Sequence, residues 1–221
     1  MPAGETLPNQ ARDSLYTAVL SDTLDGCGLR HQVLHPGIRP LDDGLVLCGR
    51  ARTGNFMDVY HEREHANPYE LEIALIDDLK PGEVVVLACG GSGRIAPWGE
   101  LLSTAARMRG AVGCVTDGLT RDVRQIRAMA FPVFAGGIGP LDSRGRGYLA
   151  AMDVPVECGG VPVSPGDLVF GDVDGVLVIP RAVEEEVLRK ALDKVKGEDT
   201  TRRELLKGAL LGDVYNKYGV L

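Results

Sequence analysis

Between residues 84 and 135, short apolar runs alternate with amphipathic ones, and this alternation constrains the fold more than any other feature. Five segments follow one another as strand, helix, strand, helix and strand, at 84–88, 97–109, 112–116, 122–129 and 132–135. A proline suits the first turn of the first helix, and a glycine follows its last residue as a C-cap does. Strands and helices that alternate on this scale predict a parallel sheet with right-handed crossovers.

The flanking segments predict helices and antiparallel strands around this core. In chain order we expect a loose lead-in at 1–10, a helix at 15–24, two strands at 45–48 and 49–53, and a helix at 71–79. Two closing helices are expected at 182–196 and 201–211. Turn-forming stretches at 164–167 and 172–175 indicate hairpins. We therefore expect an α/β fold, a layered α/β/β/α sandwich with a mixed sheet. We expect a single domain over 1–221, with a C-terminal helical extension at 182–221.

Composition and charge exclude several classes of protein. Apolar residues make up 44% and charged residues 25% of the chain, the balance of a globular domain. The net charge is −7 and no Lys/Arg block is present, so nucleic acid is not an expected partner. Five scattered cysteines without a CxxC pair argue against a zinc ribbon or a disulfide framework. No leader-like start or membrane-length apolar run is present, so we expect a cytoplasmic protein without a membrane partner.

A zinc pattern, H-E-x-x-H, occurs at residues 61–65. Two histidines one helical turn apart can share a metal, with the glutamate between them as a base. All five residues are charged or polar here, and Pro68 follows closely. This composition favours a solvated helix start or loop over a buried metalloprotease helix.

A glycine pattern at residues 91–96, G-x-G-x-x-A, follows a predicted strand, and Asp117 ends the next one. A dinucleotide-binding fold places its ligand at such a loop, provided that the helix begins within the glycines. Pro97 lacks a backbone N–H and would clash inside a helix. The helix is therefore expected to begin near Pro97, which lengthens the loop and argues against dinucleotide binding.

The same segment is better suited to a small anion. The free N–H groups of the helix that begins near Pro97, together with its dipole, favour a carboxylate or phosphate. The neighbouring strand end supplies Asp117 through Asp122, and adjacent strand ends form the ligand crevice in sheets of this kind. Arg121 can bind a carboxylate or keto oxygen, and Asp122 can bind a hard cation. On spacing alone, Asp122 could equally cap the next helix and Arg121 could be a surface residue.

Several motifs together make the sequence similar to the RraA-like family over nearly its whole length. This family comprises 4-hydroxy-4-methyl-2-oxoglutarate aldolases, 4-carboxy-4-hydroxy-2-oxoadipate aldolases and regulators of ribonuclease E activity. The resemblance implies a fold of the swivelling-domain type. The motifs that carry it are S-D-T-L-D (21–25), G-R-A-R-T (49–53), G-E-L-L (99–102), G-A-V-G (110–113), D-G-x-x-R-D (117–122), V-S-P-G-D (163–167), D-x-D-G-V (172–176) and D-x-Y-x-K-Y-G (213–219).

The resemblance implies a metal site and a substrate site at these residues. Asp122 would be the sole direct protein ligand of a Mg²⁺ or Mn²⁺ ion, and Arg121 would bind the keto oxygen and stabilise the enolate. The segment from Gly99 would bind the substrate carboxylate through the N–H groups of Glu100, Leu101 and Leu102. A metal and an arginine beside a keto oxygen suit this chemistry, because negative charge builds there in the transition state.

The resemblance also implies a site shared between subunits. The Glu100 side chain would orient a water on the metal. A further catalytic glutamate would come from the adjacent subunit; Glu198 matches its place in the sequence best, and Glu204 is the alternative. The segment 196–200 is expected to lie between two closing helices, with Gly197 breaking the helix. The assembly implied is a homotrimer, or a hexamer built from trimers.

These features lead to one expected function and two alternatives. The expected function is a metal-dependent lyase that cleaves a 4-hydroxy-2-oxo acid to pyruvate and also decarboxylates oxaloacetate. One alternative is a non-catalytic regulator that binds ribonuclease E, although such family members are shorter and lack the C-terminal helices. The other is a family member that acts on an unrelated small molecule. The side chains that would select the rest of the substrate are expected within 55–67 or 142–146.

Overall fold

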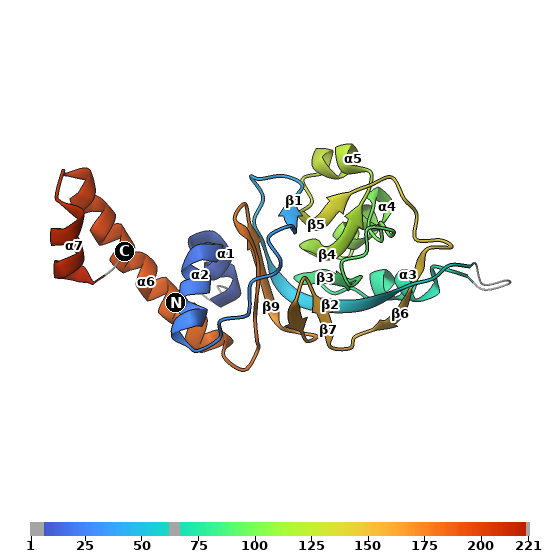
Figure 1. The fold of residues 1–221 in the computed structure, drawn as a ribbon, viewed down its shortest axis with the longest axis horizontal. Helices are drawn as coiled ribbons and strands as arrows, with labels where there is room; N and C mark the ends of the chain where they lie inside the picture. Colours follow the sequence, from blue (N-terminus) through green and yellow to red (C-terminus); the bar gives the residue numbers. More distant parts are fainter. Residues whose placement is uncertain (1–6, 62–66, 220–221) are drawn as a thin grey trace.

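An eight-stranded mixed sheet organises the fold in the computed structural model, which describes residues 7–61 and 67–219 (Figure 1). Seven strands follow the order β1-β5-β4-β3-β2-β9-β10, and β6 pairs with the far half of β2. The pairs among β2, β3, β4 and β5 are parallel, as the alternating sequence predicts. The strands of this sheet are Arg39–Pro40, Leu47–Asp58, Glu83–Ala88, Gly113–Thr120, Val133–Ile138, Gly147–Met152, Leu168–Asp172 and Gly175–Ile179.

Seven helices and a small hairpin complete the described part of the chain. Strands β7 (Val156–Cys158) and β8 (Val161–Val163) form the hairpin. The helices α1 to α7 are Leu7–Ser14, Thr17–Gly26, Glu70–Asp77, Glu100–Met108, Val123–Ala128, Glu184–Leu206 and Leu211–Tyr218. Helices α3, α4 and α5 are the crossovers between the parallel strands. Among the described residues, no helix is both long and apolar enough to cross a lipid bilayer.

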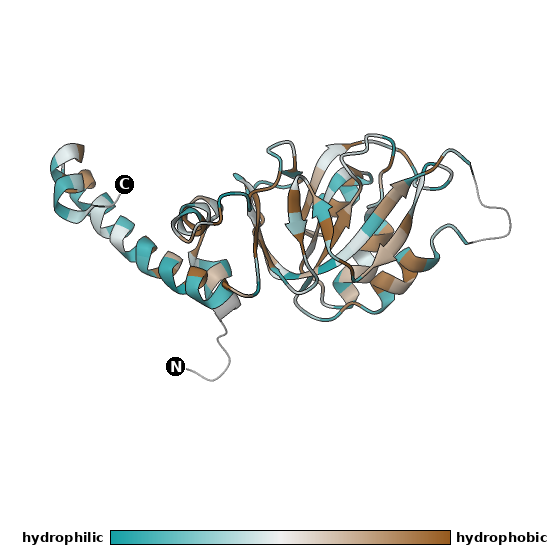
Figure 2. Cartoon of the chain, turned by 60° about the horizontal axis from the view of Figure 1, so that its bottom comes forward, coloured by the Kyte–Doolittle hydropathy of each residue, from teal (hydrophilic) through white to brown (hydrophobic). Residues whose placement is uncertain are grey.

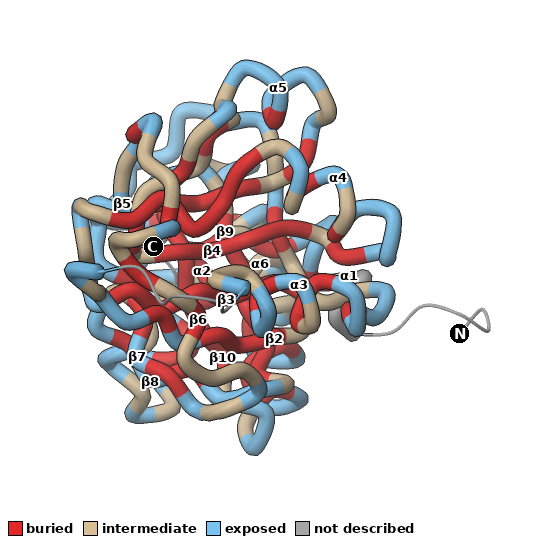
Figure 3. The backbone as a smooth tube through the Cα atoms, turned by 90° about the vertical axis from the view of Figure 1, so that its right-hand side faces the viewer, coloured by how far each residue is buried: buried red, intermediate tan, exposed pale blue. Residues whose placement is uncertain are grey.

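Three buried clusters define the layers of the molecule. Alternate residues of β3 face opposite sides: Val85 and Leu87 pack toward α3–α5, whereas Val84 and Val86 pack against the hairpin, β9 and β10. This period of two is what a strand buried on both faces requires. Figure 3 shows the resulting continuous band of buried backbone through the strands, with exposed loops around it.

A third cluster lies on the outer side of β9 and β10. Leu168 and Phe170 pack there against helices α1, α2 and the first half of α6. The layers are therefore helix, sheet, curled strands and helix, so the predicted α/β fold with a mixed sheet is confirmed. The second strand layer is the continuation of the same sheet, which curls into a shape close to a barrel. In Figure 2 the apolar colouring lies mainly on the strands and the helices beside them, whereas the projecting part of α6 is mostly hydrophilic.

Two predicted boundaries near the N-terminus differ in the structure. The loose lead-in expected at 1–10 overlaps α1, because Ala11 and Leu15, one helical turn apart, are buried against the third cluster. The two strands expected at 45–48 and 49–53 are one strand, β2. Gly49 does not interrupt it, because the glycine provides room for the carbonyl oxygen of Gly82, 2.5 Å from the position that a Cβ would take.

The predicted helix break at Gly197 is wrong. Helix α6 runs without interruption from Glu184 to Leu206, and the chain turns at Gly208, which has φ of +89°. A glycine inside a helix costs only about 1 kcal/mol, and ion pairs three residues apart on both sides of Gly197 oppose that cost. These pairs join Lys196 to Asp193 and Arg202 to Asp199. The second half of α6 extends away from the sheet, with α7 at its end (Figure 1).

Candidate active site

The C-terminal end of β4 and the start of α4 lie side by side. Trp98 and Thr120 form a parallel bridge, and the Arg121 N–H donates a hydrogen bond of 3.0 Å to the Trp98 carbonyl. The Trp98 ring is 1% exposed, and its Nε1–H donates to Oγ of Ser103 at 2.8 Å. Trp98 is thus paired with the end of β4 and is not helical. For this reason α4 begins at Glu100, three residues later than predicted.

Asp122 has an unusual backbone conformation, and its side chain points toward α4. Its φ of 58° and ψ of 32° lie in the left-handed region, which few residues other than glycine adopt. Asp122 stands at the N-cap position of α5, but its carboxylate makes no capping hydrogen bond to that helix. Oδ2 instead accepts the Glu100 N–H at 3.1 Å. The local backbone thus presents Asp122 to the start of α4.

Gly99 is the residue that permits this approach. A Cβ at position 99 would lie 2.7 Å from Oδ2 of Asp122 and 3.2 Å from Cγ of Arg121. Its φ of −154° is extended and available to any residue, so the requirement for glycine is one of space. Every larger side chain would displace the two residues that follow β4.

The start of α4 provides backbone donors at the same place. The first intrahelical hydrogen bond runs from the Ser103 N–H to the Gly99 carbonyl at 3.1 Å, so the N–H groups of Glu100, Leu101 and Leu102 precede it. The Glu100 N–H already donates to Asp122, so the N–H groups of Leu101 and Leu102, with the positive end of the helix dipole, are the ones placed to bind a substrate carboxylate. The Glu100 side chain accepts a hydrogen bond of 2.8 Å from the Thr104 hydroxyl.

Arg121 lies between two carboxylates. Its Nε is 3.9 Å from Oδ2 of Asp122, and its Nη1 is 3.6 Å from Oδ1 of Asp142. The Tyr69 hydroxyl donates to Oδ2 of Asp142 at 2.7 Å. Burial would raise the pKa of Asp142, but this hydrogen bond and the Arg121 charge outweigh it and hold the pKa below its usual value. Burial and the same carboxylate raise the pKa of Tyr69 to about 12, so its phenol stays protonated.

Arg121, Asp122, Asp142 and the start of α4 border one cleft of about 340 Å³, although Glu100 itself is not among the lining residues. Its floor contains the buried Trp98, and its walls come from α3, α4, the end of β4 and the 142–143 segment. The cleft is large enough for a small dicarboxylic acid. The lining residues are Tyr69, Glu72, Ile73, Ala96, Pro97, Trp98, Gly99, Leu101, Leu102, Arg121, Asp122, Asp142 and Ser143.

The donor set fits a hard divalent cation held by one carboxylate. Asp122 is half-exposed at the cleft, and its Oδ2 accepts one backbone hydrogen bond, from the Glu100 N–H. Mg²⁺ prefers oxygen ligands and keeps several waters, so one carboxylate suits it. Over the described residues, no group of three or more His, Cys, Asp or Glu side chains forms a closed metal site. The chemistry of Asp122 therefore fits such an ion, whereas a site closed by protein ligands is not found.

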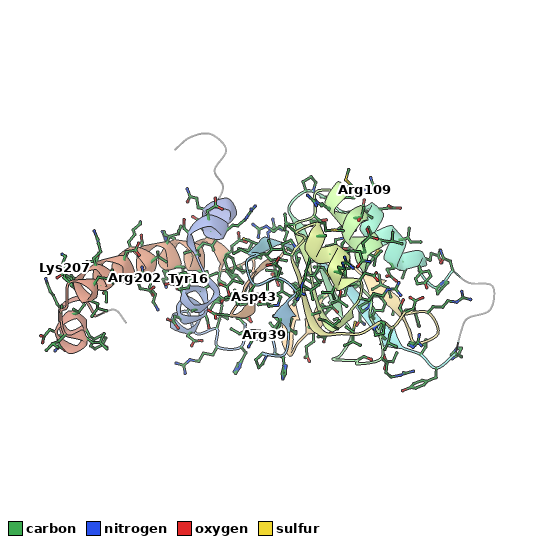
Figure 4. The ribbon with its side chains drawn as sticks, turned by 90° about the horizontal axis from the view of Figure 1, so that it is seen from above. Tyr16, Arg39, Asp43, Arg109, Arg202 and Lys207 are labelled. Atoms are coloured by element: carbon green, nitrogen blue, oxygen red, sulfur yellow. The ribbon has the colours of Figure 1, made fainter. Side chains whose placement is uncertain are left out.

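Glu198 is not part of this cleft in its own chain. It lies on α6, where its carboxylate accepts a hydrogen bond from the Tyr16 hydroxyl. Figure 4 shows Tyr16 beside α6, far along the molecule from Arg109 at the end of α4. Glu204, the other candidate, forms an ion pair of 3.0 Å with Lys207. A role for either glutamate in the cleft thus requires a second subunit, and remains a prediction.

The glycine pattern at 91–96 belongs to a loop that Asp117 holds in place. Asp117 uses both carboxylate oxygens on backbone N–H groups, Oδ1 on Cys89 and Oδ2 on Gly91 and Gly159. It therefore anchors the glycine loop, and α4 begins well beyond Gly93, at Glu100. In the H-E-x-x-H motif, all residues except His61 lie outside the described part of the chain.

Comparison with known proteins assigns this chain to a family. The RraA-like family model, described as Aldolase/RraA, matches residues 17–178. A Halalkalibacterium halodurans protein named "Putative 4-hydroxy-4-methyl-2-oxoglutarate aldolase" is 35% identical over 192 residues, 87% of this chain and 85% of that protein. The chain therefore belongs to the RraA-like family, as its motifs indicate. The same aldolase name recurs among further relatives, which supports a lyase at the level of the family.

Two other similarities extend beyond the family match. Protein DlpA of Legionella pneumophila is 31% identical over 97% of this chain, but the match covers 34% of DlpA, so the chain spans about a third of that relative. The crystal structure of RraAS2 from Streptomyces coelicolor, described as an unusual member of the RNase ES inhibitor RraA protein family, has a TM-score of 0.79. It is 32% identical, and the match covers 91% of this chain and 97% of that one. The fold is thus shared over nearly the whole chain.

Glu72 and Tyr69 were not among the predicted site residues. In the helix predicted at 71–79, Leu71, Ala74, Leu75 and Leu79 lie at helical spacing, but Leu71 is 37% exposed and Glu72 is 7% exposed. The buried face runs through 72, 75, 76 and 79, a regular helical spacing with a glutamate in it. This glutamate on an otherwise apolar face was the available signal. Asp142 lies in one of the segments expected to select the substrate.

Proposed function

We propose that the chain is a divalent-metal-dependent lyase that cleaves a 4-hydroxy-2-oxo acid to pyruvate and also decarboxylates oxaloacetate. The observation that carries the proposal is the meeting of Arg121, Asp122 and the free N–H groups of α4 in one cleft. The aldolase names of the relatives point to the same class of reaction. Both reactions pass through the enolate of pyruvate, so one site can serve both.

Each part of the cleft has a role in this chemistry. The N–H groups of Leu101 and Leu102 would bind the substrate's C1 carboxylate at the helix N-terminus. The Arg121 guanidinium would lie at the keto oxygen, where negative charge develops as the C–C bond breaks. Asp122 would hold a Mg²⁺ or Mn²⁺ ion, which would act as a Lewis acid toward the 2-oxo acid. Glu100 would position water beside Asp122.

The assembly proposed is a homotrimer, or a hexamer of such trimers, with Glu198 given to the cleft of a neighbouring subunit. The second half of α6 and α7 project from the body (Figure 1), and exposed apolar side chains lie at the end of α6 and in the turn to α7, Leu206 at 82% and Leu210 at 72% exposure. Exposed apolar groups on a projecting arm favour burial against another protein surface. A second copy of this chain would cover these side chains, and Glu198 of one subunit would then lie at the cleft of the other.

Pyruvate release tests the proposed function. The protein would be incubated with a panel of 4-hydroxy-2-oxo acids and with oxaloacetate, with and without Mg²⁺, and pyruvate would be measured by a coupled dehydrogenase assay. Metal-dependent release from at least one 4-hydroxy-2-oxo acid is expected. If the panel yields no pyruvate above the rate in buffer, the lyase proposal is wrong, and binding to an endoribonuclease becomes the function to test.

A further inference from the structure

Glu72 is a buried acid whose second carboxylate oxygen is unsatisfied. The residue is 7% exposed, and Oε2 has no hydrogen-bond partner among the described residues. Burying a carboxylate without partners destabilises a fold, so few proteins keep one without a use for it. Leucine or methionine at this position of α3 would continue the apolar face formed by Leu75, Ile76 and Leu79. The glutamate therefore calls for a functional explanation.

The position of Glu72 suggests that function. Its side chain lines the cleft that also contains Arg121 and Asp122, although α3 is remote from both in sequence. The charged groups that act on it are Asp142 and Arg121, and the Tyr69 hydroxyl on the preceding turn is bound to Asp142. Glu72 is thus an acid inside the cleft that none of the roles above employs.

The surroundings also set its proton affinity. Burial raises the pKa of Glu72 to about 7, the nearby Asp142 adds to the increase, and the Arg121 charge opposes it. A carboxyl group with this pKa can both accept and release a proton near neutrality, as general acid–base catalysis requires. Cleavage of a 4-hydroxy-2-oxo acid needs both transfers, because the C4 hydroxyl loses a proton and C3 gains one.

We propose that Glu72 is the catalytic proton carrier of the lyase reaction, an inference that rests on the proposed function. As a carboxylate, Glu72 takes the proton of the C4 hydroxyl, the C4 oxygen becomes a carbonyl, and the C3–C4 bond breaks. The electron pair of that bond moves onto pyruvate as an enolate, with its charge on the keto oxygen beside Arg121. Protonated Glu72 then gives the same proton to C3, which forms the methyl group and restores the carboxylate. No other reactant is consumed.

Decarboxylation of oxaloacetate distinguishes a role of Glu72 in proton transfer from a role in substrate binding. Loss of CO₂ from oxaloacetate produces the same enolate without removal of a hydroxyl proton, and solvent can protonate the enolate after its release. Glu72 is therefore required for cleavage and for proton exchange at the pyruvate methyl group, and it is dispensable for decarboxylation.

The test compares Glu72→Gln with a matched control, Glu70→Gln, an exposed glutamate on the same helix. Three rates would be measured with Mg²⁺ present: cleavage of the best 4-hydroxy-2-oxo acid, decarboxylation of oxaloacetate, and exchange of the pyruvate methyl protons in D₂O by NMR. Glu72→Gln is expected to lose about 10²- to 10⁴-fold in cleavage and in exchange while most oxaloacetate turnover remains. Glu70→Gln is expected to match the wild type in all three.

Other results would overturn the inference. Equal losses in all three rates would assign Glu72 a structural or substrate-binding role, and wild-type rates in all three would assign it none. A wild-type protein that releases no pyruvate from any substrate would overturn the proposed function as well. If Glu72→Gln does not fold, the pH dependence of the wild-type enzyme still tests the proposal. Its kcat/KM for cleavage should fall as pH drops below about 7, because Glu72 becomes protonated, whereas kcat/KM for decarboxylation should not depend on the protonation of Glu72. Parallel pH profiles for the two reactions would contradict the proposal.

Discussion

The backbone N–H of Glu100 donates a hydrogen bond to Oδ2 of Asp122 across 3.1 Å, so the first residue of α4 holds the carboxylate that follows β4. Asp122 adopts a left-handed backbone conformation at this contact. Strain of this kind is stored mainly at functional sites, where neighbouring structure enforces it. The contact thus couples the proposed carboxylate-binding helix end to the proposed metal ligand.

Gly99→Ala tests the space that this contact requires. The new Cβ would lie 2.7 Å from Oδ2 of Asp122, so the carboxylate must move, and a shift of about 1 Å can reduce turnover about 10²-fold. We expect such a loss in pyruvate release with a nearly unchanged melting temperature. Gly93→Ala is the matched control, because a Cβ there meets nothing within 4 Å. Equal activity of the two variants would show that Gly99 does not position Asp122.

Arg121→Lys is expected to impair turnover more than stability. An ammonium group lacks the planar fork of a guanidinium, so the charge on the keto oxygen loses its directed donors. Loss of one such donor typically raises the barrier by about 3 kcal/mol. Steady-state kinetics would show a fall in kcat, whereas Arg124→Lys, an exposed arginine on α5, keeps wild-type values. A near-normal kcat with a raised KM would limit Arg121 to substrate affinity.

Much of this site followed from the sequence, and the remainder depended on packing. The alternation between 84 and 135 predicted the parallel core, and the adjacent Arg121 and Asp122 were found at a strand end as expected. Glu72 was missed because periodicity assigned the buried face of α3 one residue out of phase. The ion pair of Arg121 with Asp142 joins segments that are 21 residues apart in the chain. This pairing depends on how the loops fold back, so no local sequence pattern predicts it. Helix α6 continued past Gly197 because one glycine costs a helix of this length only about 1 kcal/mol, and the ion pairs on both sides offset part of that cost.

Stability should depend on pH through Glu72. An unfolded glutamate titrates near 4.5, and the folded chain holds the pKa at about 7. Between these values the unfolded state releases a proton that the folded state keeps, so the free energy of unfolding falls as pH rises, by up to about 3 kcal/mol. Urea denaturation at pH 4.5 and pH 8 would show this loss in the wild type and in Glu70→Gln. It should be smaller in Glu72→Gln, and an identical pH dependence in that variant would contradict the assignment.

Mixing of inactive variants tests the shared site. Asp122→Asn lacks the proposed metal ligand and Glu198→Gln lacks the proposed donated carboxylate, so each homo-oligomer is expected to be inactive. After subunit exchange, some interfaces pair an intact Asp122 with an intact Glu198, and part of the activity should return. Glu185→Gln, an exposed glutamate near the start of α6, serves as an active control. Full activity of Glu198→Gln alone, or no recovery after verified exchange, would exclude donation of this residue.

The most direct measurement is Mg²⁺-dependent pyruvate release by the wild type and by Asp122→Asn. Asp153→Asn provides the control, because Asp153 shares the left-handed conformation, with φ of 57°, but does not line the cleft. The account predicts that the wild type and Asp153→Asn lose pyruvate release on chelation and regain it with Mg²⁺, whereas Asp122→Asn remains orders of magnitude slower at every Mg²⁺ concentration. Undiminished release after chelation, or wild-type turnover by a folded Asp122→Asn, would contradict a metal-dependent lyase centred on Asp122.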